Sequence, residues 1–196
     1  MSQEMKNLSD YFFVRNNHVC PWWLCFTFDN LLRRLVQNPE KIIESYVHSG
    51  DTVLDVGPGM GYFSIPLAKI VGERGSVFAA DVQQEMLNAL QKRAKGAGVE
   101  KRIILHLCKK DSLGLDTKFD FALAFWMVHE VPEQDSFFGE IRSLLKPNGK
   151  LLISEPTIHV TKAMYEETVK KAIRAGFTLK SNPKIFLSRS ALFSKE

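Results

Sequence analysis

The sequence of 196 residues has few cysteines and no long apolar run. It has three cysteines, Cys20, Cys25 and Cys108. A small and odd number of cysteines argues against a disulfide framework. The longest apolar run, residues 121–128, is much shorter than the roughly 20 residues of a membrane-spanning helix. The first residues also lack the apolar segment of a signal peptide. We therefore expect a reduced, cytoplasmic protein with no membrane partner.

The sequence also has no basic block, no repeat and no low-complexity stretch. Lys plus Arg (26) exceed Asp plus Glu (22) by only four (26 − 22), which gives no clear indication of a nucleic-acid partner. Cys20 and Cys25 are too far apart for the usual zinc spacing, even with His18 nearby, so we expect no metal site. The length suits one domain that buries about 70% of the surface of its unfolded chain.

The most informative stretch is the run of residues 53–63, in which an apolar β-branched segment leads into alternate glycines. Gly57, Gly59 and Gly61 are separated by single residues, one of them Pro58, and an apolar segment with helical spacing follows. This pattern predicts a strand, a glycine loop and a helix, which is a nucleotide-binding arrangement. The glycines permit a tight turn and close approach of a ligand to the backbone.

Two carboxylates distinguish this loop from the phosphate-binding loop of dinucleotide folds, whose spacing is G-x-G-x-x-G. Asp55 lies two residues before the first glycine, where it would repel a pyrophosphate but attract an ammonium group. Asp81 ends the next apolar run and is placed to accept both ribose hydroxyls of a nucleoside. A ligand with a nucleoside, a cationic amino-acid end and no phosphate is S-adenosylmethionine.

The sequence resembles the class I S-adenosylmethionine-dependent methyltransferases in four blocks: residues 53–61, 77–81, 119–125 and 145–153. The resemblance implies an α/β fold, a Rossmann-like three-layer sandwich. Its seven-stranded sheet would be mostly parallel, with the last strand antiparallel. Residues 1–50 would form a helical N-terminal extension or lid, and residues 51–196 the methyltransferase domain.

The resemblance also implies further cofactor contacts. An acidic residue after the third strand commonly accepts a hydrogen bond from the adenine amino group in this family, and Asp111, followed by Ser112, has that place. Val82, just beyond Asp81, would border the adenine. Phe125, with Trp126, would lie behind the methionine portion at the carboxyl end of the fourth strand.

The acceptor side of the site is expected around the loops after the fourth and fifth strands. His129 either acts as a general base or lines the pocket, because its ordinary pKa is near neutrality. Glu130 is an alternative of the same kind, and Glu155 lies beside the expected pocket at the end of the fifth strand. Trp22 and Trp23 either cover the substrate or pack the extension against the domain.

Local signals give the expected element bounds. Asn38 is predicted to cap a helix that starts at Pro39 and ends at Gly50. A second helix, residues 133–145, is expected to turn through residues 147–149 into a strand over residues 150–154. The other expected strands are residues 52–56, 76–81, 102–107 and 119–125, with a closing antiparallel pair at 177–179 and 188–193.

The predicted activity is methyl transfer from S-adenosylmethionine to a small-molecule acceptor. Within the class, the sequence resembles the broad group that contains ubiquinone and menaquinone C-methyltransferases and arsenite methyltransferases. The cysteine positions do not fit arsenite chemistry. A non-catalytic S-adenosylmethionine-binding or scaffold protein is the alternative, followed by an NAD-dependent oxidoreductase. The acceptor and the oligomeric state stay open.

Overall fold

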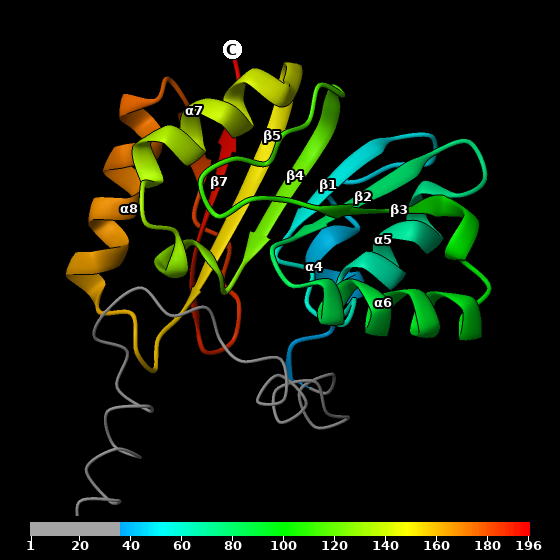
Figure 1. The fold of residues 1–196 in the computed structure, drawn as a ribbon. Helices are drawn as coiled ribbons and strands as arrows, with labels where there is room; N and C mark the ends of the chain where they lie inside the picture. Colours follow the sequence, from blue (N-terminus) through cyan, green and yellow to red (C-terminus); the bar gives the residue numbers. More distant parts are fainter. Residues whose placement is uncertain (1–35) are drawn as a thin grey trace, which may run out of the picture.

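A seven-stranded sheet forms the centre of the structure, a computed structural model that describes residues 36–196 (Figure 1). The strand order is β3-β2-β1-β4-β5-β7-β6. β1 to β5 are parallel, and β7 runs antiparallel to both of its neighbours, which confirms the predicted fold class. The strands are β1 (Thr52–Val56), β2 (Ser76–Asp81), β3 (Ile103–Leu107), β4 (Phe119–Phe125), β5 (Leu145–Pro156), β6 (Thr178–Ser181) and β7 (Ser188–Ser194).

Helices cover both faces of the sheet, because successive strand residues point to opposite faces and both faces are apolar. Val53 and Phe121 belong to the apolar cluster under α4, α5 and α6, whereas Leu54 and Ala122 belong to the cluster under α7 and α8. Figure 1 shows these two helical layers on either side of the sheet. The helices are α4 (Pro39–Ile43), α5 (Ser64–Val71), α6 (Gln84–Gly96), α7 (Gln134–Leu144) and α8 (Lys162–Arg174), with short 3-10 turns η1 (Glu100–Arg102) and η2 (Val128–Glu130).

The strand order creates one position at which the chain reverses its direction across the sheet. β1 pairs with β2 on one side and with β4 on the other, so the connections after β1 and β4 leave in opposite directions. In open α/β sheets the crevice at the carboxyl ends of such strands is the usual ligand site. The loops after β1, β2, β3 and β4 all meet there.

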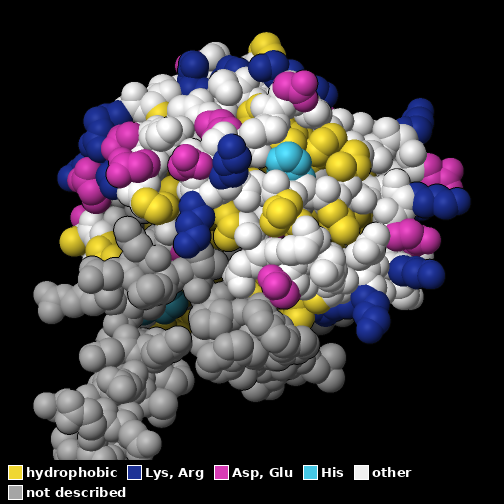
Figure 2. All heavy atoms as spheres, in the orientation of Figure 1, with side chains coloured by type: hydrophobic (Ala, Val, Ile, Leu, Met, Phe, Trp, Pro, Cys, Tyr) yellow, Lys and Arg dark blue, Asp and Glu magenta, His cyan; other side chains and the backbone are white. Residues whose placement is uncertain are grey.

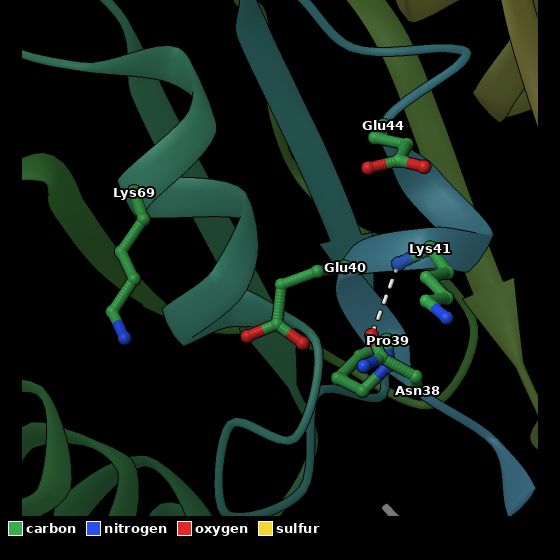
Figure 3. A pocket seen from close by; sticks show the side chains of 6 residues that line it. All are labelled: Asn38, Pro39, Glu40, Lys41, Glu44 and Lys69. Carbon is green, nitrogen blue, oxygen red and sulfur yellow. Dashed lines mark hydrogen bonds between the residues drawn. The ribbon is translucent and has the colours of Figure 1, made fainter.

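The first described helix is shorter than predicted. Asn38 caps it as expected, since its side chain accepts a hydrogen bond from the Lys41 backbone N–H at 3.1 Å (Figure 3). The helix ends at Ile43, whereas the sequence predicted an end at Gly50. The following residues form turns that are held by Asp51, whose carboxylate accepts from the His48 N–H at 2.7 Å.

The start of β5 also differs from the prediction. Leu145 was expected in the helix, but it is the first residue of β5 and pairs with Phe119. The predicted turn, residues 147–149, lies inside β5 as an irregularity. Asn148 has φ 63° there, and the register of the pairing with β4 shifts before Lys150. The strand therefore extends beyond 150–154 at both ends. β3 begins at Ile103 rather than 102, because η1 occupies Arg102.

Several predictions fall outside the described residues. They are the aromatic segment with Trp22 and Trp23 and the cysteines Cys20 and Cys25. The division into residues 1–50 and 51–196 stays a prediction. In residues 36–196, no helix is both long and apolar enough to cross a membrane. On the face drawn in Figure 2, Lys and Arg side chains are interspersed with acidic ones.

Candidate functional site

A cavity of about 260 Å³ lies at the carboxyl ends of β1, β2, β3 and β4. It brings together residues that are far apart in the sequence, because four parallel strands end at this edge. Eight of the predicted site residues line it: Gly57, Gly59, Asp81, Val82, Asp111, Ser112, Trp126 and Glu130. The predicted residues Asp55, Pro58, Gly61, Phe125, His129 and Glu155 are not among its lining residues.

The glycine loop after β1 needs its glycines for two different reasons. Gly57, Gly59 and Gly61 all have positive φ values, of 65°, 53° and 90°. A Cβ added to Gly61 would lie 2.2 Å from Leu90 Cδ1, so this glycine lets the loop pack on α6. A Cβ added to Gly59 would meet nothing within 4 Å, and this residue lines the cavity. Gly59 therefore leaves the backbone open to a ligand.

Asp81 links the end of β2 to the glycine loop. Its carboxylate accepts hydrogen bonds from the backbone N–H groups of Gln83, at 2.9 Å, and of Gly59 and Val82. The side chain is only 7% exposed, and burial raises its pKa to about 6, against the opposing effect of these hydrogen bonds. A buried carboxylate in a cavity wall is a strong acceptor for hydroxyl groups.

Asp55 is buried and holds the two ends of the glycine loop together. Its Oδ2 accepts a hydrogen bond from Ser64 Oγ, at the start of α5, at 2.6 Å. Burial raises the pKa of Asp55 to about 7, the Ser64 hydrogen bond lowers it, and the charge of Asp81 raises it further. Because Asp55 does not line the cavity, its contact with a cofactor ammonium group stays a prediction.

The loop after β3 contributes Asp111 and Ser112, and α7 fixes its shape. Glu140, on α7, accepts hydrogen bonds at 3.0 Å from Ser112 Oγ and from the N–H groups of Leu113 and Gly114. Glu140 also lines the cavity, although no local signal in the sequence marks it as a site residue. Only the fold brings this helical residue next to a loop 26 to 28 positions earlier in the chain.

Trp126 continues β4 into the cavity in an unusual conformation. Its φ is 60°, which is rare for a bulky residue and marks strain that the surroundings must hold. Its N–H donates to Ser154 O at 2.7 Å, and its indole Nε1–H donates to Ser188 Oγ at 2.8 Å. Phe125, before it, packs on Phe63 with ring centroids 4.4 Å apart. Trp126 is thus fixed where β4 ends at the cavity, its indole bonded to Ser188, and Phe125 supports it from the core.

His129 and Glu155 form a buried pair next to the cavity. Glu155 is 1% exposed, and its Oε1 accepts from the Val128 N–H at 2.9 Å. Its Oε2 lies 2.5 Å from His129 Nδ1, and His129 Nε2 lies 3.0 Å from His159 Nε2. Glu130, the neighbour of His129, does line the cavity. Of the two predicted bases, Glu130 is therefore the one on the cavity wall.

Other lining residues are apolar or neutral. Met127, Val131 and Phe137 give one side of the cavity an apolar surface. Cys108 also lines it, and burial raises the pKa of its thiol to about 11, so it stays protonated at neutral pH. No signal in the sequence marked these residues, since apolar side chains in loops and helices are normally part of a core.

Another hollow, of about 530 Å³, lies between α4 and α5 (Figure 3). It is lined by Asn38, Pro39, Glu40, Lys41, Glu44 and Lys69, none of which was predicted to belong to the site. Its charged side chains are those of solvated helix surfaces. Within residues 36–196, no group of three or more His, Cys, Asp and Glu side chains is arranged to hold a metal ion.

Comparison with known proteins identifies the family. The methyltransferase-domain family matches residues 47–189, which is most of the chain. The chain belongs to this family. The predicted recognition as a class I S-adenosylmethionine-dependent methyltransferase is confirmed, and membership implies S-adenosylmethionine as the cofactor.

Two curated relatives are similar to this methyltransferase domain. A demethylmenaquinone methyltransferase of Lactobacillus johnsonii is 35% identical over 130 residues, 63% of this chain and 52% of the relative. A ubiquinone/menaquinone biosynthesis C-methyltransferase of Francisella tularensis is 28% identical over 138 residues, 68% of this chain and 55% of the relative. The chain thus spans about half the length of these curated relatives.

A solved structure shows the same fold over nearly the whole chain. The S-adenosylmethionine-dependent methyltransferase of Aquifex aeolicus has a TM-score of 0.81 and 25% identity, over 91% of this chain and all of that chain. The chemical groups that line the cavity suit the implied cofactor. Its open glycine backbone and its buried carboxylate suit a nucleoside that carries a cationic end and no phosphate.

Proposed function

We propose that this methyltransferase domain transfers the methyl group of S-adenosylmethionine to a small aromatic acceptor of the quinol class. The observation that carries the proposal is the meeting of Gly59, Asp81 and Trp126 in one cavity wall, with an open backbone, a buried carboxylate and an aromatic ring. The named activities of the relatives, which methylate quinone precursors, support the acceptor class.

Each part of the cofactor has a proposed partner. Asp81 accepts from the ribose hydroxyls, and Val82 borders the adenine, whose amino group faces Asp111. The backbone of Gly57 and Gly59 lies along the amino-acid end. Pro58 and Gly61 shape the loop. Asp55, through its hydrogen bond with Ser64, holds the loop closed beneath the positive charge of the cofactor's amino-acid end.

The chemistry requires little more than alignment. The methyl carbon of a sulfonium is already activated, so the enzyme must hold donor and acceptor in line at about 3–3.5 Å. S-adenosylmethionine supplies the methyl group and a leaving thioether. Met127, Val131 and Phe137 provide an apolar surface on which a flat ring can lie, and they exclude water from the site.

The proposal is tested by methyl transfer to 1,4-naphthohydroquinone as the acceptor probe, with S-adenosylhomocysteine and the methylated product measured by mass spectrometry. Asp81→Asn should weaken S-adenosylmethionine binding at least about tenfold, because hydrogen bonds to a charged acceptor contribute about 1.5–3 kcal/mol. Asp116→Asn, at an exposed loop position outside the cavity, is the matched control and should bind and turn over normally.

Two results would contradict the proposal. Unchanged affinity of the folded Asp81→Asn variant would remove Asp81 from the cofactor site. Tight S-adenosylmethionine binding by the unaltered chain without turnover of any quinol acceptor would favour the alternative, a binding or scaffold protein with this fold.

A further inference from the structure

A chain of hydrogen bonds runs from a buried carboxylate to the surface beside the cavity. Glu155 is 1% exposed, the side chain of His129 is 9% exposed, and His159 lies on the exposed segment between β5 and α8. The contacts are Glu155 Oε2 to His129 Nδ1, at 2.5 Å, and His129 Nε2 to His159 Nε2, at 3.0 Å. The three groups therefore form a continuous line that is buried at one end and solvated at the other.

We infer that Glu130, His129 and His159 form a relay that carries the proton released by methyl transfer from the cavity to solvent, with Glu155 as the positioning residue. The inference rests on the proposed function, because methylation of a quinol ring carbon releases one proton. The ring carbon gives an electron pair to the methyl carbon, the C–S bond breaks toward sulfur, and the ring proton leaves.

Glu155 sets the protonation pattern of His129. Its Oε1 accepts from the Val128 N–H, so Oε2 is the oxygen that accepts the Nδ1–H of His129. With the proton fixed on Nδ1, Nε2 is the ring atom that gains and loses a proton. A carboxylate that holds an imidazole in this tautomer and stabilises its cation is an established device in proton transfer.

Glu130 connects this line to the cavity. It lines the cavity, and its Oε1 lies 4.0 Å from His129 Nε2. Proton-transfer contacts are often long in an empty site and shorten when substrate binds. A proton taken by the Glu130 carboxylate thus passes to His129 Nε2, next to His159 Nε2, and from His159 to water.

The elements around the relay hold it in place. η2 is fixed by Gln134 Nε2, which donates to Val128 O at 2.9 Å. The segment that carries His159 is fixed by Arg189 Nη1, which donates to Val160 O at 2.7 Å. These bonds keep the two imidazoles in contact, with ring centroids 4.7 Å apart.

The charged and titratable groups that face the relay are Glu130 on η2, Glu155 on β5, Arg189 on β7 and Tyr165 on α8. Burial lowers the pKa of His159, and the neighbouring His129 lowers it further. Two imidazoles this close do not both hold an extra proton at neutral pH. The pair therefore holds at most one extra proton, and His159, its exposed member, is the one that passes this proton to solvent.

The first test needs no acceptor. Ring nitrogen resonances of the ¹⁵N-histidine-labelled full chain are followed between pH 5 and 9. His159→Gln should shift the titration midpoint of His129 by about half a pH unit or more, because interacting sites titrate together. His48→Gln, at an exposed turn position whose side chain is 72% exposed, should leave it unchanged. An unshifted midpoint in the His159→Gln variant would overturn the relay.

The second test uses turnover of 1,4-naphthohydroquinone. His159→Gln should lower kcat about tenfold or more at pH 7 without changing S-adenosylmethionine affinity. Added imidazole should restore the rate of this variant and leave His48→Gln unaffected, because a small base replaces a proton carrier but not a structural contact. A slow variant that imidazole does not restore, or a variant with normal kcat, would overturn the proposal.

The two tests separate this inference from the proposed function. Failure of the unaltered chain to bind S-adenosylmethionine would remove the proposed function, and the resonance measurement would still decide whether the histidines share a proton. Normal turnover in the unaltered chain and in the His159→Gln variant would keep the proposed function and remove the relay.

Discussion

Gly59 and Gly98 offer a matched pair of residues that separates ligand contact from backbone strain. Both have positive φ, of 53° and 68°, and a Cβ added to either would meet nothing within 4 Å. Alanine in this conformation costs about 1–2 kcal/mol at each position. Only Gly59 lines the cavity.

Gly59→Ala should therefore weaken S-adenosylmethionine binding about tenfold or more, whereas Gly98→Ala should leave the affinity unchanged. Both variants should lower the melting temperature by similar amounts. Calorimetric titration and thermal melts measure both effects. Equal affinities of the two variants would show that no ligand approaches the Gly59 backbone.

The buried carboxylates Asp55 and Asp81 predict a pH dependence of cofactor binding. Burial raises their pKa values to about 7 and about 6, so both are partly protonated near pH 6 in the free protein. A cationic ligand lowers the pKa of nearby carboxyl groups. Binding at pH 6 should therefore release protons, and affinity should increase as the pH rises from about 5 to 7.

The measurement is calorimetric titration at pH 6 in two buffers with different ionisation enthalpies. The difference in the observed enthalpy gives the number of protons released, which should approach zero at pH 8. Absence of proton release at pH 6 would mean that the cofactor's charge does not reach these carboxylates.

The same raised pKa values affect the free energy of unfolding. A carboxyl group whose folded pKa lies above its unfolded value of about 4 opposes folding when it ionises. This opposition is absent below about pH 4 and complete above about pH 7 for Asp55. Such buried charges are typical of functional sites.

At the level of elements, α7 should control the affinity of the adenine side through Glu140. Glu140 accepts three hydrogen bonds from the loop after β3. In Glu140→Gln, the NH₂ group of the amide would face some of these donors and could not accept from them. The loop at residues 112–114 should lose its fixed shape, and S-adenosylmethionine affinity should fall about three- to tenfold. The control is Glu166→Gln, on the exposed face of α8, 3.6 Å from Lys162.

Titration calorimetry and the exchange protection of the Leu113 and Gly114 amides measure this effect. The expected result is faster exchange of both amides together with weaker binding in Glu140→Gln only. Unaltered exchange would show that the loop keeps its shape without α7.

The element bounds show which local signals are sufficient. β1, β2 and β4 have the predicted bounds because each is a short apolar run between turn residues. Leu145 was assigned to a helix because its apolar side chain continues the helical spacing. Pairing with Phe119 draws it into β5 instead, and that contact depends on the tertiary structure.

At the scale of the whole molecule, the seven-stranded, mostly parallel sheet follows from the family resemblance, whereas the site is only partly predictable. The sequence identified Gly57, Gly59 and Asp81 because glycine spacing and strand ends are local. It did not identify Glu140, Met127 or the contact between His129 and His159. These contacts arise where distant segments meet, 26 to 30 residues apart in two of the cases.

The acceptor class depends on parts that the family resemblance does not determine. Trp126 and Glu130 lie in a loop whose chemistry differs among proteins of the same fold, so fold alone does not fix the substrate. The predicted contribution of Trp22 and Trp23 to this side of the site stays a prediction, since both lie outside the described residues.

A thermal melt with S-adenosylmethionine, S-adenosylhomocysteine and NAD is the most direct test of whether this chain binds an adenosyl cofactor. At 100 times its dissociation constant, a ligand adds about 2.7 kcal/mol to the free energy of unfolding, which raises the midpoint of a chain of this length by roughly 5–10 °C. We expect such a shift with both adenosyl ligands and none with NAD. A shift with NAD alone, or no shift with any of the three, would contradict this expectation.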